Sequence, residues 1–264
     1  MVIFITGISS GFGLETARLL SQKGHTVYGT VRREVKPLPF VHYIQLDVRD
    51  ADAVKQAVDG IVEKEGRIDV LVNNAGMGIG GPLEFATEEE IHLQMDTNFM
   101  GLVHCVNAVL PYMRKQGSGK IIALSSIGGL MGLPFQGFYS ASKFAIEGYC
   151  EALRLEVKSM GINVVTIRPG DFSTGFTGSR KKVTNEAALQ VYPLYRDAIN
   201  KVEHDETGGL KPIVLAHKIS QVITMRHPRN GYVVASLEQR LSVLLKRILP
   251  AKWFGRILGS YYKL

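Results

Sequence analysis

Short apolar runs alternate with longer segments of helical periodicity along most of the chain. A run that is apolar at nearly every position is typical of a strand buried on both faces of a parallel sheet. Such runs predict strands at 2–6, 25–31, 42–46, 69–72, 119–126, 162–167 and 231–235. A period near 3.6 residues predicts helices at 14–24, 49–65, 88–116, 139–160 and 213–225. The alternation predicts one α/β domain around a parallel, seven-stranded sheet.

Composition narrows the class of partner. The chain has 264 residues, a net charge of +7 and a pI of about 9.3. This balance suits an anionic ligand, a nucleic acid or a membrane surface. No nucleic-acid-binding motif occurs and the longest basic run is 180–182, so we expect no nucleic-acid partner.

The cysteines and the chain start bear on the cellular setting. Cys105 and Cys150 fall in expected helices, where buried free thiols are favoured over a disulfide. The first strand leaves no room for a signal peptide, and no run of 18 apolar residues exists. We therefore expect a cytoplasmic protein, and no metal site.

A glycine-rich turn follows the first strand directly and precedes a helix. This order places phosphate on the N–H groups of a helix N-terminus. The alternative is a structural turn without a ligand. The spacing is Gly-x-x-x-Gly-x-Gly, and the turn reads Gly7, Ile8, Ser9, Ser10, Gly11, Phe12 and Gly13. The turn favours a doubly wound, Rossmann-type sheet with helices on both faces.

The end of the second strand indicates which dinucleotide the turn serves. A carboxylate there suits the ribose 2′-hydroxyl of NAD, whereas an arginine suits the 2′-phosphate of NADP. Val31 and Arg32 occupy this position, and no carboxylate occurs before Glu34. We therefore expect NADP, with Ser10 adding a hydroxyl to the same phosphate. Surface solvation of Arg32 is the alternative.

Asp47 ends the third strand, and Val48 follows it. Two roles fit Asp47 equally. It caps the helix at 49–65, it accepts a hydrogen bond from the adenine amino group, or it does both.

Tyr139 and Lys143 are four residues apart at the start of a helix, so both side chains lie on one face. A nearby ammonium favours the phenolate and lowers the pKa of a tyrosine. A phenol adjusted in this way can pass a proton to or from a substrate oxygen. Ser126 ends the preceding strand and offers a hydroxyl to the same oxygen. An ordinary surface pair is the alternative for the Tyr–Lys spacing taken alone.

Asn98 stands in the middle of the long helix predicted over 88–116. Its amide competes for backbone groups, so a kink or a bound water is expected there. The fourth strand ends in Asn73, Asn74, Ala75 and Gly76, whose small size permits close approach of a cofactor.

Two segments depart from the regular alternation. Residues 175–209 are polar with weak periodicity, which indicates an irregular substrate lid over about 171–209. The tail, 236–264, continues the domain formed by 1–235. It contains an apolar stripe formed by Leu241, Leu244, Leu245 and Ile248. Basic residues beside the stripe are Arg240, Lys246 and Arg247, and the aromatic residues that follow are Trp253, Phe254, Tyr261 and Tyr262. This tail either contacts a membrane surface weakly or packs over the pocket or a partner subunit.

Taken together and in this order, these motifs resemble the short-chain dehydrogenase/reductase family over about residues 1–235. The glycine turn, 73–76, Asn98, Ser126, Tyr139, Lys143 and the Pro169-Gly170 pair carry the resemblance. Within this family, the chain looks most like the 17β-hydroxysteroid and retinol dehydrogenase branch. Three segments carry this likeness: SIGGLMGLPF, YSASKFAIEG and YGTVRR. The family is commonly a homodimer or homotetramer, which we expect here.

The resemblance implies a role for each matching residue. Tyr139 is the general acid/base, Lys143 lowers its pKa and binds the nicotinamide ribose, Ser126 orients the substrate oxygen, and Asn98 holds a water. The implied cofactor-binding residues are Gly7, Ser9, Ser10, Gly11, Phe12, Gly13, Arg32, Asp47, Val48, Asn74, Ala75, Gly76, Tyr139, Lys143, Pro169, Gly170 and Thr174.

The expected function is an NADP(H)-dependent oxidoreductase that interconverts an alcohol and a ketone or aldehyde. Apolar residues around Ser126 and Tyr139 indicate a steroid-, retinoid- or lipid-like substrate. For some of these residues, packing in the hydrophobic core is an equally good interpretation. The expected pocket residues are Met131, Phe135, Phe138 and Phe172. The alternative function is a catalytically silent NADP-binding regulatory or scaffold protein, which would require a missing catalytic residue.

Overall fold

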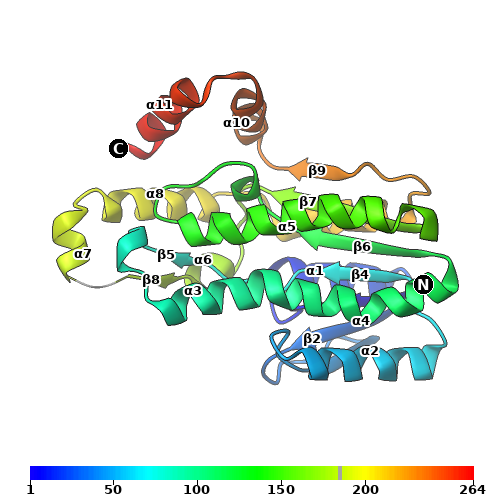
Figure 1. Cartoon of the computed structure of the whole chain (residues 1–264). Helices are drawn as coiled ribbons and strands as arrows, with labels where there is room; N and C mark the ends of the chain where they lie inside the picture. Colours follow the sequence, from blue (N-terminus) through cyan, green and yellow to red (C-terminus); the bar gives the residue numbers. More distant parts are fainter. Residues whose placement is uncertain (184–185) are drawn as a thin grey trace.

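Seven parallel strands form the central sheet in the order β3-β2-β1-β4-β6-β7-β9 (Figure 1). The computed structural model describes residues 1–183 and 186–264. The strands are β1 Val2–Ile5, β2 Thr26–Val31, β3 Val41–Gln45, β4 Val70–Asn73, β6 Gly119–Leu124, β7 Ile162–Pro169 and β9 Gly231–Val234. Each predicted strand is confirmed, and each of its ends lies within two residues of the predicted end.

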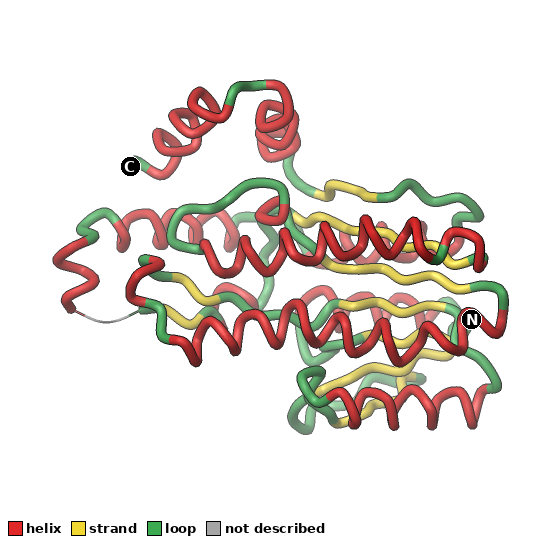
Figure 2. Tube along the Cα trace, in the orientation of Figure 1, coloured by secondary structure: helices red, strands yellow, loops and turns green. Residues whose placement is uncertain are grey.

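Helices cover both faces of the sheet, which confirms the doubly wound arrangement (Figure 2). Successive side chains of a strand point to opposite faces. The helices on the two faces are α1 Gly11–Gln22, α2 Ala51–Glu65, α4 Gly101–Gln116, α5 Gly137–Glu156 and α9 Pro212–Thr224. Accordingly Phe4 packs with α2, α4 and α5, whereas Ile3 and Ile5 pack with α1 and α9. Both faces are therefore apolar, as the unbroken hydrophobic runs predicted.

The order of the strands reverses next to β1. The chain builds β2 and β3 on one side of β1, and then β4, β6, β7 and β9 on the other. The loops after β1 and β4 therefore diverge and leave a crevice at the carboxyl ends of the strands, where ligands bind in such sheets.

The helix predicted over 88–116 is interrupted at the expected place. It consists of α3 Glu88–Met95 and α4, which are joined by a π-helical turn at Asp96–Met100. Asn98 lies within this turn, so the local irregularity expected at Asn98 is present.

The expectation of an irregular stretch over 175–209 is wrong for most of the described residues. This part of the chain forms α6 Phe176–Ser179, β8 Lys181–Lys182, α7 Glu186–Val191 and α8 Tyr195–Thr207. β8 pairs with β5, Ile79–Gly80. The buried residues of α8, which are Tyr195, Ala198, Ile199 and Val202, do follow helical spacing, but charged neighbours obscure the pattern. Residues 184–185 of the expected lid lie outside the described residues.

The tail forms two helices at the top of Figure 1, α10 Leu237–Ile248 and α11 Ala251–Tyr262. Pro250 follows Leu249 between them and disfavours helical backbone at the residue before it. Short 3₁₀ turns lie at Leu83–Phe85, Ile127–Gly129 and Lys158–Met160. Among the described residues, no helix has the length and apolarity needed to cross a bilayer.

Both cysteines are buried and free, as expected. Burial raises the pKa of each thiol to about 12, so neither is a reactive thiolate.

Candidate active site

A cavity of about 590 Å³ lies where the strands end, and most of the residues singled out from the sequence line it. Residues from the glycine turn, α5, the segment after β7 and the tail face the same space. The residues expected in the site that do line it are Gly7, Ser9, Ser10, Gly11, Phe12, Arg32, Asp47, Val48, Asn74, Ala75, Gly76, Ser126, Met131, Tyr139, Lys143, Pro169, Gly170, Phe172 and Thr174.

The glycine turn leaves space that side chains would fill. Gly7 and Gly11 have φ angles of 72° and 58°, which side-chain-bearing residues rarely adopt. Gly13 does not line the cavity. A Cβ at Gly13 would lie 2.2 Å from the Gly7 carbonyl oxygen and 2.6 Å from Asn74 Nδ2. Gly13 therefore permits the turn to close, while Gly7 and Gly11 border the cavity.

Asn74 and Thr6 hold the turn in place. The Asn74 amide donates to the carbonyls of Thr6 and Gly7, each at 2.8 Å. The Thr6 hydroxyl accepts from the backbone N–H groups of Asn74 and Ala75, each at 2.9 Å. Ser10 is exposed at the start of α1 and its side chain makes no capping hydrogen bond within the described part of the chain. Its hydroxyl is thus available to a phosphate, and the cradle fits a dinucleotide.

Arg32 and Asp47 flank the cavity where β2 and β3 end. Arg32 is exposed, so its guanidinium is available to an anion. Asp47 pairs with Arg49, whose Nη2 lies 2.7 Å from Asp47 Oδ2, and this hydrogen bond lowers the pKa of Asp47. The capping role considered for Asp47 is wrong, because Asp50 caps α2 by accepting from Ala53 N at 2.9 Å. The adenine contact stays a prediction.

Tyr139 and Lys143 project from the same face of α5 into the cavity. Lys143 Nζ lies 5.7 Å from the centre of the Tyr139 ring and donates to the Leu124 carbonyl at 2.8 Å. Ser126 ends the run from β6 and also borders the cavity, where its Oγ accepts from Gly128 N at 3.0 Å. A phenol, an ammonium and a hydroxyl thus meet beside the glycine turn.

Burial has the largest effect on the pKa values of Tyr139 and Lys143. It raises the pKa of Tyr139 to about 12, while the hydrogen bond with Ser126 acts in the opposite direction. Burial also lowers the pKa of Lys143 to about 8, and Glu147 opposes this shift. The implied lowering of the Tyr139 pKa by Lys143 therefore does not prevail here, and near neutral pH the phenol carries its proton.

Asn98 lies behind the catalytic candidates and does not line the main cavity. Its Oδ1 accepts from Met77 N at 2.8 Å, and its Nδ2 donates to Met77 O and Ser142 Oγ, each at 3.0 Å. A Cβ on Gly76 would contact Asn98 Oδ1 at 3.3 Å and Lys143 Nζ at 3.8 Å. The π-helical turn thus brings the Asn98 amide close to Lys143. The water assigned to Asn98 stays a prediction.

Two of the expected substrate-pocket residues lie elsewhere. Phe135 packs against Tyr192 and Tyr195, with ring centres 6.2 Å and 5.3 Å apart. Phe138 precedes Tyr139 on α5 and does not line the cavity, and successive helical side chains differ by about 100° in direction. The apolar wall also contains residues that the sequence did not single out for the pocket, which are Val202, Ile257 and Leu258. The tail residues Phe254, Tyr261 and Tyr262 complete it.

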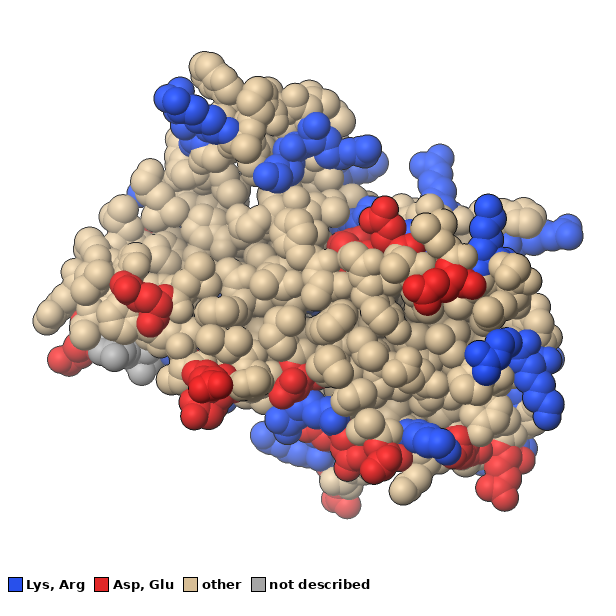
Figure 3. Space-filling view, in the orientation of Figure 1, with Lys and Arg blue, Asp and Glu red and all other residues tan. Residues whose placement is uncertain are grey.

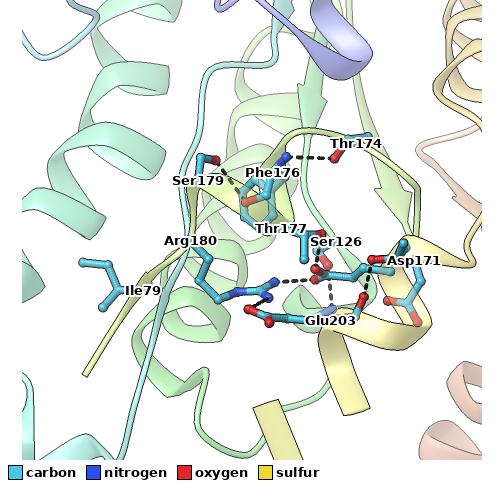
Figure 4. A network of polar contacts seen from close by, with 12 residues as sticks. Ile79, Ser126, Asp171, Thr174, Phe176, Thr177, Ser179, Arg180 and Glu203 are labelled. Carbon is cyan, nitrogen blue, oxygen red and sulfur yellow. Dashed lines mark hydrogen bonds and ion pairs between the residues drawn. The ribbon is translucent and has the colours of Figure 1, made fainter. Parts of the chain in front are cut away.

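A cluster of carboxylates that the sequence did not indicate lines the cavity. Figure 4 shows Asp171, Arg180 and Glu203 in a network of polar contacts next to Ser126. Asp171 follows β7 and accepts from Gln239 Nε2 at 2.6 Å. Asp205 and Glu206 lie on α8, which was not expected to be a helix. Burial raises the pKa of Asp171 to about 6, and the nearby charges of Glu206 and Asp205 add to the shift. The only available signal was the position of Asp171 directly after a strand end.

Arg180 neutralises part of this cluster. Its side chain is 1% exposed and its Nη2 binds Glu206. Thr177 also donates to Glu206, at 2.6 Å. Among the described residues that line the cavity, Arg32 and Lys143 are the only Lys or Arg side chains. Both flank the glycine turn and Tyr139. On the remaining wall Asp205 pairs with Lys201 at 3.3 Å, so in this carboxylate cluster only Asp171 has no ion pair among the described residues.

Comparisons with known proteins agree with this geometry. Residues 1–185 match the family model described as short chain dehydrogenase. A 3-ketodihydrosphingosine reductase of Bacteroides thetaiotaomicron is 47% identical over 263 residues, which cover 99% of this chain and 97% of that protein. The 17-beta-hydroxysteroid dehydrogenase type 1 of Homo sapiens is 39% identical over 212 residues, 72% of this chain and 64% of that protein.

A crystal structure gives the same result for the fold. A short-chain dehydrogenase from Streptomyces avermitilis superposes with a TM-score of 0.80 and 28% identity, covering 99% of this chain and 96% of that one. The expected likeness to hydroxysteroid dehydrogenases is confirmed by the human relative. From its sequence match, its sheet and its glycine turn, the chain belongs to the short-chain dehydrogenase/reductase family.

Proposed function

We propose that this oxidoreductase uses NADP(H) and Tyr139 to reduce the ketone of a long-chain, lipid-like substrate that carries a protonated amine. The family makes the chain an oxidoreductase of carbonyl and alcohol groups. The observation that carries the proposal is one cavity lined by the glycine turn, by Tyr139 with Ser126 and Lys143, and by the carboxylates around Asp171.

The residues divide the chemistry between them. When bound, the nicotinamide cofactor supplies or accepts the hydride. Ser126 Oγ holds the substrate oxygen, and the protonated Tyr139 donates its proton to that oxygen as the ketone becomes an alcohol. The Lys143 ammonium stabilises the phenolate that remains. In the opposite direction, the same phenol accepts the proton of an alcohol.

Arg32 supports the choice of NADP over NAD. It stands at the end of β2, is exposed and lines the cavity. A guanidinium matches the geometry of a phosphate in a bidentate way, and Ser10 lies in the same cavity wall.

The wall of the cavity supports the substrate class. Apolar side chains from α8 and α11 suit an alkyl chain. Asp171 suits a cation, because among the described residues it has no ion pair, whereas Glu206 pairs with Arg180 and Asp205 with Lys201. The bacterial relative is a 3-ketodihydrosphingosine reductase, and that compound is a long-chain ketone with an amine beside the carbonyl.

The alternative of a catalytically silent protein has less support. It requires a missing catalytic residue, whereas Asn98, Ser126, Tyr139 and Lys143 are all present and lie near one another or line the same cavity.

The experiment compares two ketones of equal chain length, 3-ketodihydrosphingosine and the same ketone without the amine. Each is offered with NADPH and with NADH, and loss of the reduced nicotinamide absorbance is followed. We expect kcat/KM to be roughly tenfold or more higher for the amino ketone, because a charged hydrogen bond is lost without the amine. Equal kcat/KM values for the two ketones would rule out recognition of the amine, and no turnover of either ketone would rule out the proposed reaction.

A further inference from the structure

The tail helices expose an apolar face, and of its residues only Ile257 also lines the cavity among the described residues. Six large apolar side chains on α10 and α11 form this outer face, which consists of Leu237, Leu241, Leu244, Ile248, Trp253 and Ile257. Their exposed fractions run from 48% to 81%. The stripe seen in the sequence therefore points largely outward, and the buried contact of α10 is made by Val243.

Positive charge is concentrated on the same helices. Residues 237–264 contain six Lys or Arg and one acidic residue, Glu238. The tail thus carries five of the seven excess positive charges of the chain. Figure 3 shows Lys and Arg atoms over α10 and α11 at the top of the view.

The combination of exposed apolar and basic side chains selects one kind of partner. A second copy of the chain, docked through the same face, would bring two tails of net positive charge together. A nucleic acid would match the charge but would leave the apolar side chains exposed. An anionic lipid surface meets both, since apolar side chains enter the acyl boundary while Lys and Arg pair with head groups.

The inner side of α11 borders the active-site cavity. Phe254, Leu258 and Tyr262 line the cavity from this helix. Ile257 and Tyr261 line it as well, yet are 48% and 47% exposed. A single helix therefore separates the cavity from the outer face.

We propose that α10 and α11 dock on an anionic membrane surface, so that a lipid-like substrate passes from the bilayer past α11 into the cavity. The docking step is supported by the exposed apolar side chains of the outer face and by the positive charge of α10 and α11. The delivery step rests on the proposed function, because it requires a lipid-like substrate.

Trp253 makes the docking measurable in the full-length chain, because it is the only tryptophan and is 59% exposed on the outer face. The protein is mixed with vesicles of phosphatidylcholine alone, or of equal parts phosphatidylcholine and phosphatidylglycerol, and sedimented. We expect co-sedimentation with the anionic vesicles, a shift of the Trp253 emission to shorter wavelength, and protection from acrylamide. Binding to neutral vesicles should be roughly tenfold weaker.

The test variant is the double substitution Leu241→Glu and Leu244→Glu, and Leu155→Glu is the matched control. Leu155 is 73% exposed on α5, away from the tail. We expect the double variant to lose vesicle binding by roughly tenfold or more, while Leu155→Glu binds as the parent does. Neither change touches a residue that lines the cavity, so reduction of a short, water-soluble ketone should be unchanged.

Two outcomes overturn the proposal. One is the absence of co-sedimentation with anionic vesicles and of any shift in Trp253 emission. The other is a double variant that alters the oligomeric state by analytical ultracentrifugation and binds vesicles no less than the parent, which would make the face a contact between copies. Failure of the proposed function is separate, since it would appear as no ketone turnover in a protein that still binds vesicles.

Discussion

The Lys143 ammonium lies 5.7 Å from the centre of the Tyr139 ring, but its hydrogen bond goes to the Leu124 carbonyl. The two groups share a cavity wall without a direct hydrogen bond between them. Burial raises the pKa of Tyr139 to about 12 and lowers that of Lys143 to about 8. In this state the phenol is an acid that holds its proton, which suits donation to a ketone oxygen.

Tyr139→Phe should abolish turnover, because the phenol hydroxyl is the proposed proton donor. We expect kcat to fall by roughly a hundredfold or more, with NADPH affinity close to that of the parent by fluorescence titration. Tyr149→Phe on the same helix is the matched control, since Tyr149 packs against Phe99 and does not line the cavity. Substantial activity in Tyr139→Phe would contradict the assigned role.

Arg32→Ala should weaken NADP binding much more than NAD binding, because only NADP carries the 2′-phosphate that the guanidinium would contact. We expect the dissociation constant for NADP to rise by roughly tenfold or more. Arg33→Ala provides the control, since Arg33 is exposed but does not line the cavity. An equal loss of affinity for both cofactors would show that Arg32 does not read the 2′-phosphate.

The KM for an amino ketone should depend on pH through Asp171. Its pKa is raised to about 6 by burial and by Glu206 and Asp205, while Arg180 and Gln239 act against the rise. Below about pH 6 the carboxyl is neutral and attracts an ammonium less, so KM should fall as pH rises through 6.

Two measurements check this assignment. The ketone without the amine should show a flat KM over the same range, and Asp171→Asn should flatten the profile for the amino ketone. A KM profile that is the same for both ketones would show that Asp171 does not recognise the substrate amine.

Above about pH 8, Lys143 loses its charge, so kcat/KM should fall for both ketones.

Gly13→Ala should destabilise the glycine turn, because the added Cβ would lie 2.2 Å from the Gly7 carbonyl oxygen. We expect the free energy of unfolding to fall by roughly 1–3 kcal/mol and NADPH affinity to fall with it. Gly60→Ala on α2 is the matched control, and it should raise the free energy of unfolding. A Cβ there meets no atom within 4 Å, so unfolding should cost about 0.5–1 kcal/mol more. Urea denaturation measures both, and an unaffected Gly13→Ala would show that the turn adjusts.

Local patterns in the sequence determined the sheet, the glycine turn and the spacing of Tyr139 and Lys143. These features depend on side-chain periodicity and on steric limits within a few residues. For this reason the predicted strands agree with the structure to within two residues, and the irregularity expected at Asn98 is present as a π-helical turn.

Only the tertiary structure decided how distant segments meet. Asp171 and Glu206 belong to segments 35 residues apart, and α8 brings them together over the cavity. The direction of Phe135 and Phe138, and the position of α11 over the cavity, likewise depend on packing between elements and not on local spacing. The pKa of Tyr139 follows from burial, which is a property of the whole fold.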